Sequence, residues 1–144
     1  MDKLITAVAL SATVLFSTTV FANPDDSCDG EKLIFSGYTT KGSKYVGVCW
    51  VYGNIRYVYG KDGKKPDIVL NVPEEKVQAE VSAHGDATIV IPNGKYAYEI
   101  VEPAKYDYEL NILKNGDRIS SIQLNQDSVE SEVGGYVSRR KFGN

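Results

Sequence analysis

The stretch from Cys28 to Tyr59 reads CDGEKLIFSGYTTKGSKYVGVCWVYGNIRYVY, and it predicts the centre of a small β-domain. It holds both cysteines, the single tryptophan and five of the ten tyrosines. Apolar residues recur with a period near two and are interrupted by turn residues, which is the pattern of short antiparallel strands. Because aromatic and β-branched residues favour strands, we expect this stretch to organise the fold.

A two-residue turn at Gly53-Asn54 is expected inside this stretch, since glycine and asparagine suit the tight turns of hairpins. Directly opposite residues share one face of a sheet, so this register predicts an aromatic core face. The expected pairs on that face are Tyr52 with Ile55, Trp50 with Tyr57, and Val48 with Tyr59. Arg56 and Cys49 then lie on the opposite face.

Cys28 and Cys49 predict one structural disulfide, because two cysteines in an exported chain most simply pair with each other. The alternative is a redox or metal-binding pair. The spacing is far from C-x-x-C, and His84 is the single histidine, so we favour the disulfide. Closing a loop of this length stabilises a fold by about 3 kcal/mol in the chain-entropy model.

Residues 1–22 have the pattern of a cleaved signal peptide. Lys3 precedes an uncharged apolar run from Leu4 to Val20, and Val20-Phe21-Ala22 supplies a small-residue cleavage site. A membrane anchor is the competing interpretation, but the apolar run is at the short limit for a spanning helix. We therefore expect cleavage after Ala22, a periplasmic or secreted mature protein, and one β-domain over residues 23–144.

Short apolar runs broken by Gly, Pro and Asn continue to about residue 124. They predict an all-β fold: an antiparallel meander of seven or eight strands, either one curled, barrel-like sheet or a sandwich. The expected strands are 33–38, 45–52, 55–59, 67–72, 87–91, 96–102, 106–113 and 117–124. Residues 74–82 are expected as an extended edge or one or two helical turns. Residues 125–144 are expected as a flexible tail, with a last strand at 133–142 as the alternative.

Two further hairpins have predicted registers. A four-residue loop after Ile91 pairs that residue with Tyr96 and keeps the apolar residues on one face. At Asn115-Gly116, a three-residue loop with the glycine in the left-handed conformation leaves Leu110 opposite Ser120. This second arrangement predicts a G1 bulge in the turn.

The net charge of −3 gives no basic footprint for nucleic acid, so neither nucleic-acid binding nor a cationic membrane-surface role is expected. No arrangement of residues predicts catalysis. Ser82, His84 and Asp86 lie on one loop, whereas a catalytic triad is assembled from residues far apart in sequence. No calcium, zinc or phosphate-binding motif is present. We therefore expect a protein that is not an enzyme and has no metal and no cofactor.

Tyrosine and lysine supply the candidate binding residues. Tyrosine combines an apolar ring with a polar tip and is enriched at binding hot spots, although it is also a good strand residue. We expect Tyr45, Tyr106 and Tyr136 to be exposed and most others to be structural. The contact loops are expected at 39–44, 61–66 and 83–86, with candidate partner-binding residues Tyr45, Lys61, Lys64, Lys65 and His84. The basic residues 139–141 are expected to be solvated charge in the tail.

Four segments carry a resemblance to known proteins: 35–37 (FSG), 44–49 (KYVGVC), 56–60 (RYVYG) and 93–99 (NGKYAYE). Over roughly residues 28–124 the chain resembles small exported proteins of Gram-negative bacteria. The characterised analogues are periplasmic lysozyme inhibitors and type VI secretion immunity proteins, which are compact disulfide-bearing β-domains that block an enzyme's cleft. Ser36-Gly37 followed by Tyr45 is similar to the Ser-Gly…Tyr motif of the lysozyme inhibitors, at a different spacing, so no inhibitory residue is carried over.

The resemblance and the residues together predict a periplasmic protein-binding module, an inhibitor or immunity protein against a cell-wall-degrading enzyme. Its partner is then another protein, a cell-wall hydrolase or toxin effector, and a homodimer is kept open as a further association. No membrane span is expected once the signal peptide is removed. The alternative is a carrier of small ligands, a curled barrel with a pocket lined by Trp50 and the tyrosines.

Overall fold

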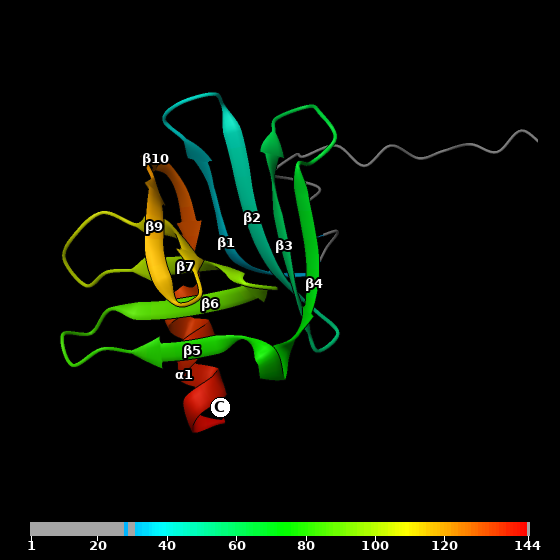
Figure 1. The fold of residues 1–144 in the computed structure, drawn as a ribbon. Helices are drawn as coiled ribbons and strands as arrows, with labels where there is room; N and C mark the ends of the chain where they lie inside the picture. The colour runs from blue at the N-terminus through cyan, green and yellow to red at the C-terminus, as the bar shows by residue number, and fades with distance from the viewer. Residues whose placement is uncertain (1–27, 29–30, 144) are drawn as a thin grey trace, which may run out of the picture.

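The computed structural model describes Cys28 and residues 31–143, which form two antiparallel five-stranded sheets and one helix (Figure 1). The predicted signal peptide lies outside these residues. The first sheet has the order β10-β1-β2-β3-β4, and the second has the order β5-β6-β7-β8-β9. The strands are β1 Lys32–Thr39, β2 Lys44–Val51, β3 Asn54–Lys61, β4 Ile68–Pro73, β5 Gln78–Val81, β6 Ala87–Asn93, β7 Tyr96–Glu102, β8 Glu109–Lys114, β9 Asp117–Ile122 and β10 Leu124–Ser131.

The predicted all-β antiparallel fold is confirmed, with ten strands in the described part of the chain instead of seven or eight. Neither sheet closes on itself, so the structure is a two-layer packing of sheets and not a barrel. β1–β4 and β5–β9 are both simple meanders, as the short turn spacing predicts. The ambiguous segment at 74–82 contains both predicted forms, a short 3-10 helix at Glu74–Lys76 (η1) followed by strand β5.

The core lies between the two sheets and is filled by apolar side chains from both. Tyr57 of β3 and Tyr98 of β7 stack face to face across it, with ring centroids 4.6 Å apart and planes 8° from parallel. The fully buried apolar residues around this pair include Ile34, Phe35, Val46, Val48, Ile55, Ile89, Ile91, Ile100 and Leu110. Side chains therefore occupy the space in which a barrel-shaped carrier would hold its ligand.

The disulfide between Cys28 and Cys49 is confirmed, with the Cα atoms 5.4 Å apart. It ties the chain before β1 to the last, turn-proximal part of β2, next to Trp50. Cys49 lies opposite Arg56 on the face of the first sheet that turns away from the core, as predicted.

The predicted register of the β2–β3 hairpin is wrong by two residues. The turn is Tyr52-Gly53, where both residues have positive φ (47° and 83°), and Trp50 pairs with Ile55. Positive φ at both central positions is the type I′ geometry, and glycine at the second position tolerates it. Because a shift of two keeps each side chain on its face, the core face survives with the exception of Tyr52, which is 81% exposed.

The registers of the other two hairpins also differ from the prediction. Ile91 pairs with Tyr98, and the turn contains two residues and not four. In the β8–β9 hairpin, Leu110 pairs with Ile122 around a two-residue turn at Asn115-Gly116, with φ of 50° and 86°. The irregularity lies in the ladder, where Ile112 and Leu113 pair with Ser120 and Arg118, and not in the turn. In both hairpins the turn is shorter than predicted, so the paired strands continue further toward the loop.

The expected flexible tail and the alternative strand at 133–142 are both wrong: residues 124–131 form β10, and Val133–Phe142 form helix α1 (Figure 1). β10 pairs with β1, which gives the first sheet its fifth strand. The helix buries Val133, Tyr136 and Val137, spaced at three and four residues, against β5, β6 and β1. Gly143 ends it in the left-handed conformation and donates its N–H to the Arg139 carbonyl at 2.9 Å.

Candidate functional site

Two of the three predicted contact loops lie side by side at one end of the first sheet. The β1–β2 turn and the β3–β4 loop meet because β2 and β3 are neighbours and Lys44 pairs with Lys61. The backbone N–H of Asp62 also donates to the Ser43 carbonyl at 3.4 Å. We call this end the basic tip and define it as residues 40–44 and 61–67 (top of Figure 1).

The basic tip carries five lysines and two aspartates. Lys44 and Asp67 form an ion pair, and this hydrogen bond with Asp67 raises the pKa of Lys44 from its usual value. The Lys44 amine also lies 5.3 Å from the centre of the Tyr59 ring. The remaining four lysines are exposed and form no ion pair with another described residue: Lys41, Lys61, Lys64 and Lys65.

Backbone contacts hold the β3–β4 loop close to its own strand. The N–H of Asp67 donates to the Tyr59 carbonyl at 2.9 Å, and the N–H of Lys64 donates to the Lys61 carbonyl at 3.1 Å. Gly60 is required here, because a Cβ at this position would lie only 2.8 Å from the Pro66 Cα. The lysines are therefore displayed on a defined loop and not on a free chain.

Tyr45, predicted as an exposed partner-binding residue, is fully buried. Its ring packs against Tyr38 at a centroid distance of 5.5 Å. Tyr136, also expected at the surface, lies on the buried face of α1, whereas Tyr106 is 84% exposed as predicted. The sequence placed Tyr45 beside a polar turn but could not show that the outer face of β2 is covered.

His84 lies on the exposed loop between β5 and β6, away from the basic tip (Figure 1). Ser82 Oγ accepts the backbone N–H groups of His84 at 3.2 Å and Asp86 at 3.1 Å, so these neighbours stabilise a loop. Asp86 Oδ1 in turn accepts the N–H of Ala104 at 2.9 Å. The β5–β6 loop and the loop between β7 and β8 line a surface hollow of about 340 Å³, and Tyr106 is part of this lining.

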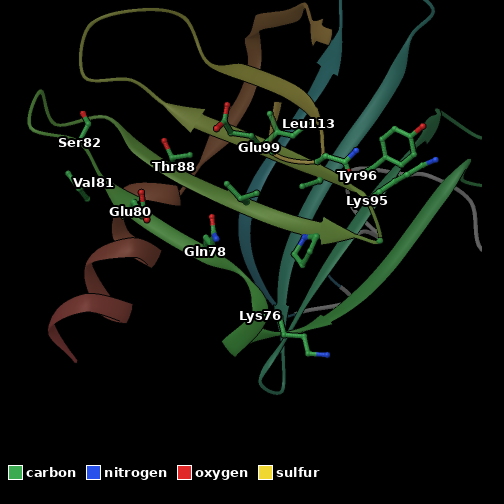
Figure 2. Close-up of a pocket in the computed structure, with 16 residues that line it drawn as sticks. Lys76, Gln78, Glu80, Val81, Ser82, Thr88, Lys95, Tyr96, Glu99 and Leu113 are labelled. Carbon is green, nitrogen blue, oxygen red and sulfur yellow. The ribbon is translucent and has the colours of Figure 1, made fainter. Parts of the chain in front are cut away.

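The largest hollow described is an open groove of about 600 Å³ on the outer face of the second sheet (Figure 2). Gln78, Glu80 and Thr88 line it from β5 and β6, as Figure 2 shows. At its far end, the amines of Lys95 and Lys114 lie 5.6 and 5.9 Å from the centre of the Tyr96 ring. Because these cations already lie near the ring, Tyr96 is a poor surface on which a ligand could stack.

Glu99, beneath the same groove, is bound within the protein. Its Oε1 accepts Asn111 Nδ2 at 2.9 Å and Arg118 Nη2 at 3.3 Å. Asn111 Nδ2 also donates to Glu109 Oε2 at 3.1 Å, so one amide and one guanidinium hold two carboxylates together. This network joins β7, β8 and β9 and supports the sheet.

A smaller hollow of about 230 Å³ was not anticipated from the sequence. It lies where α1 approaches the ends of β1 and β2, and its lining includes Trp50 and Arg139. Its neighbour Arg140, expected as solvated tail charge, is half-buried and donates to the Val77 carbonyl at 3.0 Å. The basic run 139–141 was visible in the sequence, but only a helix brings two of its members to this hollow.

Within the described part of the chain, no three His, Cys, Asp or Glu side chains are grouped closely enough to hold a metal ion. No helix there has both the length and the apolar character needed to cross a membrane. Comparisons with protein-family models, curated proteins and solved structures found no match to this chain. The case for function therefore rests on the surfaces described above.

Proposed function

We propose that this protein is a periplasmic protein-binding module that inhibits or neutralises a cell-wall-degrading enzyme through the basic tip. The observation that carries the proposal is the pairing of two loops at one end of the β2–β3 hairpin, which display four lysines that form no ion pair with another described residue. The Cys28–Cys49 disulfide supports the compartment, because such bonds persist in the periplasm and outside the cell.

The charge of the basic tip is complementary to the active site of a glycan hydrolase. Such enzymes use a pair of carboxylates that flank the scissile bond inside a cleft. A protruding loop that displays several exposed cations is attracted to that cleft, and charge complementarity of this kind raises the association rate and selects the partner. The attraction should weaken as salt is added, because exposed charges are screened beyond about 8 Å at physiological ionic strength.

A carrier that holds its ligand in a central barrel cavity gains no support from the fold. Trp50 lies at the edge of the core, and Tyr57 and Tyr98 stack where a central pocket would be. The tyrosines that the carrier hypothesis assigned to a binding cavity include the two that fill this space.

The proposal is tested by measuring inhibition of purified muramidases and amidases by the mature protein. The key variant replaces Lys61, Lys64 and Lys65 together by glutamate. If each lysine contributes about fivefold, inhibition should weaken roughly 100-fold. A matched control replaces three exposed lysines of the second sheet and its loops, Lys95, Lys105 and Lys114, and changes the net charge equally.

The control should keep its inhibition within a few-fold of the original protein. An equal loss in both triple variants would mean that net charge matters and the basic tip does not. If no wall hydrolase is inhibited and cells that express the protein are not protected, the proposed function is wrong.

A further inference from the structure

The unanticipated hollow beside α1, here named the Trp50 pocket, is built from four separate parts of the chain. Its lining consists of Lys32, Trp50, Glu74, Tyr136, Arg139 and Arg140. It lies at the end of the first sheet opposite to the basic tip, because Trp50 and Lys44 are near opposite ends of β2. Six residues of strand separate the two sites by about 20 Å.

The aromatic walls of the Trp50 pocket are held in place by hydrogen bonds. Trp50 Nε1 donates to Glu74 Oε2 at 3.1 Å. Arg140 Nη1 donates to the Tyr136 hydroxyl at 2.9 Å and lies near the ring of the same residue. Burial raises the pKa of Tyr136 to about 12, so this hydroxyl stays neutral at physiological pH. The pocket therefore has fixed, uncharged aromatic surfaces.

The cations of the pocket exceed its acids, since Glu74 is the single carboxylate among the six lining residues. Glu74 already accepts the indole N–H, and Arg140 is bound to Val77 and Tyr136. Lys32 and Arg139 are exposed and have no ion pair with another described residue. Basic residues in the last turn of a helix interact favourably with the negative end of the helix dipole, which accounts for the position of Arg139. It does not account for Lys32, which comes from β1.

We propose that the Trp50 pocket binds a small organic anion, a carboxylate or phosphate carried on a flat apolar group. The flat group would lie against Trp50, because Tyr136 is 3% exposed and Arg140 already lies near its ring. The anion would be bound by Lys32 and Arg139. The volume of about 230 Å³ is below that of pockets for drug-sized molecules, so it accepts a group about the size of one ring.

The single tryptophan makes this proposal directly measurable. In the ¹⁵N-labelled mature protein, the indole N–H of Trp50 gives one NMR cross-peak, which we follow during titration with benzoate and with phenyl phosphate. We expect a saturable shift for at least one of them, and a weaker response at high salt. Benzyl alcohol tests the need for charge, and acetate and inorganic phosphate test the need for the flat group.

Variants assign the binding to named cations. Arg139→Gln and Lys32→Gln should each weaken binding by about fivefold or more. Lys141→Gln, in the same helical turn but outside the lining, should bind as the original protein does. The triple variant of the basic tip should also keep the shift, because the two sites are separated by more than the screening length.

Four results would overturn the proposal. The first is the absence of a saturable shift with both aromatic anions. The second is an equal shift with benzyl alcohol, which would show an apolar hollow without anion selectivity. The third is unchanged affinity in both Arg139→Gln and Lys32→Gln. Equal affinity for acetate and benzoate would remove the role assigned to the aromatic walls. None of these outcomes depends on the basic tip or on inhibition of a hydrolase.

Discussion

The stacked pair of Tyr57 and Tyr98 should supply a large share of the packing between the two sheets. The exposed fractions of the two side chains are 1% and 7%, and their ring centroids are 4.6 Å apart. Replacing Tyr57 by alanine removes a buried ring, and substitutions of this kind cost about 3–5 kcal/mol. Against a typical total stability of about 5–15 kcal/mol, this loss would leave the variant marginally folded.

The stacking contribution can be separated from burial by a double-mutant cycle. Tyr57→Leu and Tyr98→Leu are made singly and together, so that apolar side chains fill most of the space in every variant. The expected coupling free energy is about 0.5–1.5 kcal/mol, the usual value for an aromatic pair beyond its buried area. Urea unfolding followed by Trp50 fluorescence gives the free energy of unfolding of each variant.

The exposed Tyr106 provides the control for this cycle. Tyr106→Leu should change the free energy of unfolding by no more than about 0.5 kcal/mol, because its ring is at the surface. A coupling free energy below about 0.3 kcal/mol, within the error of additive behaviour, would refute the reasoning. So would a cost below about 1 kcal/mol for Tyr57→Ala, since a ring packed between two sheets cannot be removed so cheaply.

Three further predictions concern the disulfide, alkaline pH and the basic tip. Replacing Cys28 and its partner by serine should lower the free energy of unfolding by about 3 kcal/mol, measured in urea; a loss below 1 kcal/mol would contradict the loop-closure estimate. Because the pKa of Tyr136 is raised to about 12 in the folded protein, its contribution to stability should be constant below pH 10 and be lost from pH 10 toward 12, where the unfolded chain loses this proton first; Tyr136→Phe should reduce the fall in thermal melts. Gly60→Ala should displace the β3–β4 loop without changing charge, and each kcal/mol of unfolding free energy lost should lower the melting temperature by about 4 °C. An unchanged amide NMR spectrum for residues 61–67 would contradict the close approach of position 60 to Pro66.

The first sheet was largely predictable because its information is local. Alternating apolar residues in 45–59 identify two strands and the face that turns inward, and these survive in the structure. The turn position was missed because Gly53 suits either central position of a tight turn. The paired part of β3 begins at Asn54, one residue earlier than expected, and Tyr52 is a turn residue.

The end of the chain was mispredicted because its partners are distant in sequence. Residues 124–131 are polar and carry little strand signal, but β1 offers them an unpaired edge. Gly134-Gly135 is unfavourable in an isolated helix. In the folded protein a side chain at Gly134 would lie 2.8 Å from the Glu102 carboxylate, so the glycine permits the close contact of α1 with the second sheet.

The candidate sites also divide into those that the local sequence predicts and those that only the fold creates. Three lysines of the basic tip, Lys61, Lys64 and Lys65, were expected at the surface from the sequence because they lie in a loop rich in turn residues, and loops are exposed. Tyr45 was assigned to the surface on the same logic and is buried, since burial of a strand's outer face depends on what packs there. The Trp50 pocket had no sequence signal, because its six residues come from four separate segments.

The sequence by itself determined the all-β class, the meander of short strands and the Cys28–Cys49 disulfide, because periodicity, turn residues and cysteine number act over a few residues or within one stretch. Only the tertiary structure decided that the sheets stack through Tyr57 and Tyr98, that β10 completes the first sheet, and that α1 forms one wall of the Trp50 pocket. These features arise from contacts between distant segments. Their free energy depends on which surfaces meet, and local pattern carries no information about that choice.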